Sequence, residues 1–194
     1  MRIKIYIAAM LLSAAFVANL LFAAGGAPSK AENFKLKDYN GKEYSLSDFK
    51  NSKGIVIMFI ATQCPVSNGY NERMARLFAD YKDKGITVIG INSNKEESAE
   101  EVKIHAKEHN LNFIILKDPG NIVADKFGAS VTPETYLLNK DLEILYHGRI
   151  DDSRRGDEIK SQDLRNALDQ FLNGKKITVT GTKAFGCSIK RVGA

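Results

Sequence analysis

The sequence predicts an α/β protein with a mixed central sheet and helices on both of its faces. Two runs rich in isoleucine and valine, the continuous apolar residues 55–61 and the β-branched residues 86–91, are typical of strands buried on both faces. Helical segments follow both runs, and a hairpin and one more helix come after them. Strands that alternate with helices and then form a hairpin indicate a sheet that combines parallel and antiparallel pairs.

An N-terminal hairpin precedes the first buried strand, because residues 34–50 contain two short strand patterns around an Asn-Gly turn, followed by a short helix. An amphipathic helix is expected over residues 65–83, and Gly85 is expected to end it. The remaining elements are expected to be a charged helix over 96–110, a strand over 113–116, a helix over 121–127, a hairpin of strands 134–139 and 143–148, and a last helix over 163–172.

The first 27 residues have the features of a secretory signal peptide. A short basic start is followed by an almost wholly apolar stretch, residues 5–24, and then by small residues that offer cleavage sites. The alternative is an uncleaved anchor, because about 20 apolar residues can span a bilayer. Cleavage leaves one domain over residues 28–173 and a basic tail over 174–194. We therefore expect an exported, periplasmic protein whose thiols meet oxidants, or one tethered to the membrane through residues 5–24.

Composition limits the classes of function. The chain has 194 residues, 44% of them hydrophobic, which suits one globular domain with a proper core. Its formal net charge of +5 is too small to indicate a nucleic-acid partner. The basic residues gather after Asp169, beyond which the sequence has no acidic residue. We take that tail to be a solvated basic segment.

One of the two cysteines lies where a strand gives way to a helix. Cys64 follows the first buried strand in FIATQCPVSNGY, and Pro65 takes the first helical position. Backbone N–H groups and the helix dipole at such a junction favour a thiolate, so the placement suits a nucleophile. An inert buried cysteine is the alternative.

Several motifs, taken together with the order of elements, indicate a family. They are FIATQCP, the helix inserted at residues 96–110, KDPGNIVADKFGASVTPETYLLNKD, YHGRIDD and AFGCSIK. The stretch from about residue 34 to 172 resembles the thioredoxin-like superfamily, and more closely its peroxiredoxin-like redoxins of the alkyl hydroperoxide reductase and thiol-specific antioxidant kind. The resemblance implies a thioredoxin-like fold, a nucleophilic Cys64, and a substrate platform at Thr132 and Pro133, whose peptide bond should be cis. It also implies an external thiol donor or a thioredoxin-like reductant, and no organic cofactor.

The sequence departs from the family pattern at several functional positions. Ser67 stands where thioredoxins have their second cysteine, so no disulfide can form within the motif. Met58 occupies the position of the buried acid of thioredoxins. The proline and the threonine or serine that precede a typical peroxidatic cysteine are replaced by Ile57 and Ala61. Classical peroxidase activity is therefore not expected.

The other cysteine, Cys187, leaves three hypotheses open. It could resolve an intermediate on Cys64, form a permanent bridge that fastens the tail, or be an unrelated free thiol. Two cysteines in an exported protein favour pairing. Arg149 could favour the Cys64 thiolate or an anionic substrate, or make a surface ion pair with Asp151 or Asp152.

The sequence therefore predicts a thiol–disulfide oxidoreductase that acts through a single cysteine. Cys64 and Cys187 are the candidate catalytic residues, and Thr132, Pro133, Pro65, Ser67 and Arg149 are the candidate substrate-binding residues. A small thiol, a peroxide or a protein disulfide is the expected substrate. The alternative is a binding protein without turnover that holds a peptide, a thiol compound or a copper ion in the groove at the cis-proline.

Overall fold

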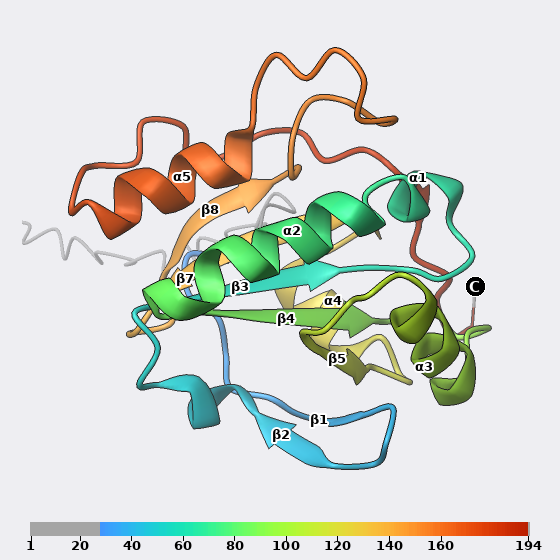
Figure 1. Cartoon of the computed structure of the whole chain (residues 1–194). Helices are drawn as coiled ribbons and strands as arrows, with labels where there is room; N and C mark the ends of the chain where they lie inside the picture. The colour runs from blue at the N-terminus through green and yellow to red at the C-terminus, as the bar shows by residue number, and fades with distance from the viewer. Residues whose placement is uncertain (1–27, 194) are drawn as a thin grey trace, which may run out of the picture.

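A seven-stranded mixed sheet forms the centre of the computed structural model, which describes residues 28–193 (Figure 1). The strands are β1 (Lys35–Asp38), β2 (Glu43–Ser45), β3 (Gly54–Phe59), β4 (Ile86–Asn92), β5 (Ile114–Lys117), β7 (Glu134–Asn139) and β8 (Ile144–Gly148), in the spatial order β2-β1-β5-β4-β3-β7-β8. β3, β4 and β5 run parallel, whereas β7 is antiparallel to β3. The predicted mixed sheet and N-terminal hairpin are confirmed.

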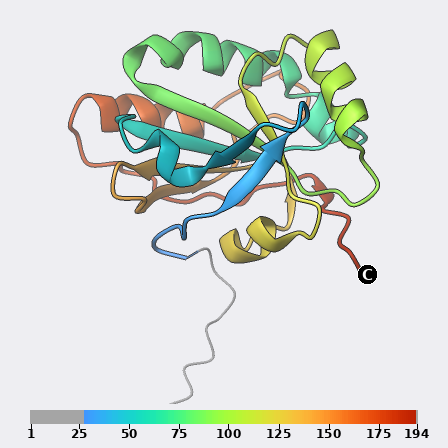
Figure 2. The same cartoon turned by 90° about the horizontal axis from the view of Figure 1, so that it is seen from below.

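Helices cover both faces of this sheet, as predicted (Figure 2). They are η1 (Leu46–Phe49), α1 (Pro65–Asn68), α2 (Asn71–Tyr81), η2 (Lys82–Lys84), α3 (Ala99–Glu108), α4 (Ile122–Phe127) and α5 (Asp163–Leu172). Side chains of β3 alternate between the two cores, because successive residues of a strand point to opposite faces. Val56 and Met58 pack with α2, α3 and α5, and Ile57 packs with α4. Both layers of the core therefore meet at the strand that leads to Cys64.

The single helix predicted over residues 65–83 is wrong in one respect, because it breaks after α1. Gly69 ends α1, and Tyr70 precedes α2. A loop passes so close to this break that a Cβ atom on Gly69 would lie 2.8 Å from the Arg154 carbonyl oxygen. Arg73 fastens the same loop, since its guanidinium donates to the carbonyl oxygens of Gly69 (3.0 Å) and Arg154 (3.2 Å). The predicted end at Gly85 is confirmed, with φ at +88°.

A second, two-stranded sheet was not predicted. β6 (Val131–Thr132) pairs antiparallel with β9 (Cys187–Ser188), in a register that sets Thr132 opposite Cys187. The segment that follows α5 thus returns to the sheet instead of extending into solvent, and in Figure 1 it passes beside α1. The predicted solvated tail is wrong at this point.

The predicted signal peptide, residues 1–27, lies outside the described residues. Between residues 28 and 193, none of the helices combines the length and the apolar character that crossing a bilayer requires.

Candidate active site

Cys64 lies directly before α1 and is only 3% exposed. Its Sγ accepts a hydrogen bond from the Ser67 N–H at 3.3 Å, and its thiol donates to the Thr132 carbonyl oxygen at 3.4 Å. Pro65 occupies the first helical position, as expected. Because α1 is only four residues long, the local N–H group stabilises the sulfur more directly than the dipole of a long helix.

Thr132 and Pro133 lie against this sulfur. The peptide bond between them is cis, which confirms the sequence prediction. The Thr132 side chain is buried, and its Oγ1 has no hydrogen-bond partner among the described residues. A buried hydroxyl without a partner is uncommon, because burying an unpaired polar group is costly. The hydroxyl is therefore free to donate to Cys64 when that thiol ionises.

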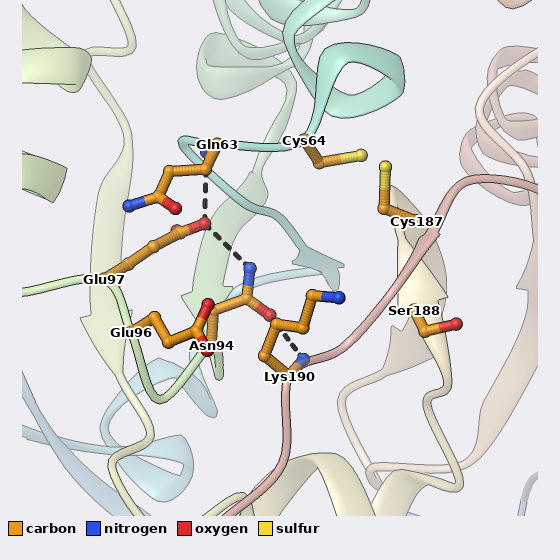
Figure 3. Close-up of a pocket in the computed structure, with 8 residues that line it drawn as sticks. All are labelled: Gln63, Cys64, Asn94, Glu96, Glu97, Cys187, Ser188 and Lys190. Atoms are coloured by element: carbon orange, nitrogen blue, oxygen red, sulfur yellow. Dashed lines mark hydrogen bonds between the residues drawn. The ribbon is translucent and has the colours of Figure 1, made fainter.

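Cys187 brings the second sulfur to the same place. The side chains of Cys64 and Cys187 point toward one another across the pocket in Figure 3, and both thiols are free. The two cysteines thus lie at one pocket, and they form no disulfide in this structure.

The two thiols differ in pKa. Burial alone would raise the pKa of Cys64, but hydrogen-bond donors around the ionised sulfur outweigh burial and hold the pKa below its usual range. These donors are the Cys187 thiol, the Ser67 N–H, the Thr132 hydroxyl and the Cys187 N–H. The pKa of Cys187 is raised by burial, by its hydrogen bond to Cys64 and by the negative charge on Cys64. Cys64 therefore ionises first.

The tail reaches Cys64 because Gly186 has no side chain. A Cβ atom there would collide with the Thr132 carbonyl oxygen and lie 3.3 Å from the Pro133 nitrogen. On the other side of the cysteine, the Ile189 N–H donates to the Ser130 carbonyl oxygen at 3.0 Å. The backbone of the tail thus pairs with the residues that lead to the cis-proline.

Asn94 holds the tail from the opposite wall of the pocket. Its Oδ1 accepts the Lys190 N–H at 2.8 Å, and the Lys95 N–H donates to the Lys190 carbonyl oxygen at 3.0 Å. The Asn94 amide in turn donates to the Glu97 carboxylate at 2.7 Å. Figure 3 shows this chain of hydrogen bonds from Lys190 to Gln63, next to Cys64.

Glu97 is a buried carboxylate, 3% exposed, that anchors the loop before Cys64. One of its oxygens accepts the Thr62 N–H at 2.8 Å and the Asn92 amide, and the other accepts the Gln63 N–H at 3.1 Å and the Asn94 amide. Burial alone would raise its pKa, but these donors outweigh burial and lower the pKa from its usual 4.5. Glu97 therefore remains ionised beneath the active loop.

Glu134 is a second buried carboxylate, and it anchors the loop before the cis-proline through backbone N–H groups. Its carboxylate accepts the Ser130 N–H at 2.8 Å and the Val131 N–H at 3.2 Å. His147 lies 2.6 Å from Glu134, and its ring stacks on Tyr136. Burial alone would raise the pKa of Glu134, but the hydrogen bond with His147 and the two N–H groups lower it.

Sequence reasoning missed Asn94, Glu97 and Glu134. The first two lie in a lysine- and glutamate-rich stretch that resembles a solvated helix, but α3 begins only at Ala99, so both turn inward. A signal for Glu97 does exist, because it follows the carboxyl end of a buried strand, the edge at which open α/β sheets bind ligands.

Ser67 and Arg149 contribute less to the site than predicted. Ser67 is fully buried, and its hydroxyl accepts the Ala61 N–H at 3.2 Å. Of the two alternatives for Arg149, the structure shows an ion pair, but with the Asp163 carboxylate of α5 at 2.7 Å and not with Asp151 or Asp152. Asp151 instead pairs with Arg73 at 2.5 Å. Arg149 is absent from the lining of the pocket at the two sulfurs.

The two sulfurs open into a cavity of about 240 Å³. Its walls come from three segments of the chain, and its lining residues are Gln63, Cys64, Asn94, Glu96, Glu97, Cys187, Ser188 and Lys190. Among residues 28–193 no group of three or more histidine, cysteine, aspartate or glutamate side chains is arranged to hold a metal ion.

Comparisons with known proteins agree with this geometry. Residues 28–147 match the AhpC/TSA family. The thiol-disulfide oxidoreductase ResA of Bacillus thuringiensis is 30% identical over 149 residues, which is 77% of each chain. An uncharacterized conserved protein from Geobacillus kaustophilus is 33% identical, with a TM-score of 0.81 and coverage of 89% of this chain and 95% of that one.

A more distant structure shows the fold. The thioredoxin domain of a Bacteroides vulgatus thiol-disulfide oxidoreductase is 20% identical, with a TM-score of 0.61 over 76% of this chain and 99% of that chain. The thioredoxin-like fold that the motifs implied is thereby confirmed, as is the predicted family. The chain belongs to the AhpC/TSA family of the thioredoxin-like superfamily.

Proposed function

We propose that this protein is a thiol–disulfide oxidoreductase in which Cys64 is the nucleophile and Cys187 resolves the intermediate. The Cys64 thiolate attacks one sulfur of a disulfide substrate, forms a mixed disulfide and releases the other half as a thiolate. Cys187 then attacks the Cys64 sulfur, a Cys64–Cys187 disulfide forms, and the second half leaves as a thiol. The substrate gains two electrons, and the two protein thiols lose them.

The observation that carries this proposal is the position of Cys187 directly opposite Cys64, held there by the pairing of β9 with β6. Thiol–disulfide exchange needs the attacking and the attacked sulfur within reach of one another. Ser67 cannot supply that second sulfur. Cys187 is the other cysteine of the chain, and its side chain points toward Cys64.

The pKa difference between the two thiols orders the steps. Because the Cys64 charge contributes to the raised pKa of Cys187, Cys187 stays protonated while Cys64 is a thiolate. Once Cys64 has entered a mixed disulfide it carries no charge, so that contribution disappears. Burial still raises the pKa of Cys187, but the Val66 N–H and the Lys190 ammonium lower it, so Cys187 ionises more readily than before the first step. The resolving thiol is thus activated by the first step.

The similarity to ResA, which carries the name of a thiol-disulfide oxidoreductase, supports this class of reaction. An external thiol donor or a thioredoxin-like reductant would return the oxidised pair to two thiols. We also propose that residues 1–27 direct export to the periplasm. Sequencing of the mature N-terminus and cell fractionation test that part, with cleavage after Ala24 or Ala27 as the expected result.

Trapping experiments with the mature protein test the mechanism. Reduced Cys187→Ser protein should stop at a mixed disulfide on Cys64 when it meets a small disulfide, whereas the wild type should release both halves and form an intramolecular bridge. Cys64→Ser protein should do neither. Mass spectrometry distinguishes these species, and titration against a thiol redox buffer gives the potential of the pair.

The reduction potential of the Cys64–Cys187 pair distinguishes a resolving role of Cys187 from a structural disulfide. A resolving pair should have a potential above the roughly −300 mV typical of structural disulfides. A Cys64–Cys187 disulfide that survives strong reductant would be a structural disulfide that holds the tail in place. Complete turnover by Cys187→Ser protein would also contradict the resolving role.

A further inference from the structure

We propose that the cavity between the two sulfurs binds small disulfides that carry both ammonium and carboxylate groups, the chemistry of an amino-acid disulfide such as cystine. This inference rests on the proposed function and adds the substrate class.

The tail restricts access to Cys64. β9 occupies the edge of β6, so an extended peptide has no free edge to pair with there while the tail is in place. Cys64 is 3% exposed, and the cavity is the opening that reaches both sulfurs. Its volume of about 240 Å³ lies below the 300–1,000 Å³ typical of sites for drug-sized ligands. Only a small substrate fits without movement of the tail.

Charges of both signs line this cavity. The exposed Lys190 and Glu96 side chains lie on its wall, and neither belongs to the ion pairs found among residues 28–193. In Figure 3 the Lys190 ammonium extends along the pocket on the side of the sulfurs. Its influence on the pKa of Cys187 agrees with that placement. A zwitterionic ligand can therefore place a carboxylate at Lys190 and an ammonium at Glu96.

The rest of the lining is polar and held rigidly. The buried Asn94 and Glu97 bind one another, and they also bind the tail and the active loop. The Gln63 amide and the Ser188 hydroxyl add groups that can both donate and accept hydrogen bonds. No large apolar side chain lines the cavity, which disfavours a hydrophobic substrate.

Atoms and electrons balance for such a substrate. Cys64 attacks one sulfur of the amino-acid disulfide and displaces one amino-acid thiolate. Cys187 then displaces the second from Cys64, and the proton it loses goes to a leaving thiolate. One disulfide is reduced to two thiols, and the protein pair is oxidised to one disulfide.

Exchange rates with two disulfides test the proposal. Reduced protein is mixed with cystine or with the uncharged 2-hydroxyethyl disulfide, and each rate is divided by that of a free small thiol to remove intrinsic reactivity. The ratio of the cystine rate to the neutral rate should exceed one. It should fall by up to about fivefold in Lys190→Gln and in Glu96→Gln, the range of an exposed ion pair. Lys183→Gln, an exposed lysine of the same tail outside the cavity, should retain the wild-type ratio.

The outcomes separate the two proposals. A ratio near one in the wild type, or an equal ratio in all variants, would overturn the substrate assignment and leave the oxidoreductase proposal standing. Parallel loss of both rates in Lys190→Gln would also overturn it, because the lysine would then act only through the pKa of Cys187. If reduced wild type reacts with neither disulfide, the oxidoreductase function itself fails.

Discussion

Replacing Glu97 with glutamine should destabilise the protein strongly, although the two side chains have almost the same shape. Each carboxylate oxygen of Glu97 accepts two donors, a backbone N–H and an amide N–H. A glutamine must put its own NH₂ group in place of one oxygen. Whichever way the amide turns, one buried amide donor and one part-buried backbone N–H then face another donor.

The expected loss follows from those two bonds. Hydrogen bonds to charged groups contribute about 1.5–3 kcal/mol each, so the loss of two gives about 3–6 kcal/mol. Such a loss is a large part of the 5–15 kcal/mol that stabilises a typical domain. Glu100→Gln is the matched control, because Glu100 is exposed and lies 3.9 Å from Lys103. That change should alter the free energy of unfolding by less than about 0.5 kcal/mol.

Denaturant unfolding at several pH values measures both the loss and its cause. The pKa of Glu97 is lower in the folded state than its usual 4.5, so its carboxylate contributes fully above that value. The contribution disappears as the pH falls through the lower folded-state pKa. The difference between wild type and Glu97→Gln should therefore be constant near neutral pH and shrink below about pH 4.5.

Two results would refute this reasoning. A loss below about 1 kcal/mol at pH 7 would mean that the two displaced donors find other partners. A loss that stays constant down to acid pH would mean that the shape of the side chain, and not its charge, supports the loop.

Three further predictions concern the sulfurs and the tail. Thr132→Val should raise the apparent pKa of Cys64, read from alkylation rate against pH, because a hydroxyl that favours the thiolate is removed; an unchanged profile would contradict this. Gly186→Ala should slow formation of the Cys64–Cys187 disulfide more than tenfold, because its Cβ would collide with a backbone carbonyl. Gly181→Ala, whose Cβ would make an ordinary contact at 3.6 Å, should form the disulfide at the wild-type rate. Equal rates in the two variants would contradict the close packing at Gly186. Ser67→Cys in the Cys187→Ser background should restore turnover with small disulfides, because residues three apart in a helical turn are about 5–6 Å apart and the new thiol can reach Cys64. A mixed disulfide on Cys64 that persists would contradict this.

Local patterns were sufficient for the elements whose stability comes from one apolar face or one end signal. The last helix, Asp163–Leu172, has the predicted bounds, since its apolar face and the Asn-Gly pair after it both lie within the segment. β3 and β4 were predicted from their apolar runs within two residues at each end. The break after α1 was not predicted, because it depends on a loop near Arg154 that lies far along the chain.

The site shows the same division between local and distant contacts. Cys64 and the cis bond before Pro133 were predicted, because a strand–helix junction and the family motifs are both visible in short stretches. Glu97 was missed, because its partners Thr62 and Gln63 lie 35 and 34 residues earlier. A charge that is buried by distant backbone groups has the same local sequence as a charge in solvent.

The tail explains why the second cysteine was the hardest residue to place. β9 has two residues, too few to show any strand periodicity, and it forms only because Gly186 lets two backbones meet. The basic residues around Cys187 predict a segment exposed to solvent. In the structure, however, Ile189 is buried, and the backbone of Lys190 is hydrogen-bonded to Asn94. The side chain of Lys190 is thereby left available in the cavity. One short segment thus supplies a sulfur and a cation to the same pocket, which is why substrate specificity and resolution of the intermediate should respond together when the tail is displaced.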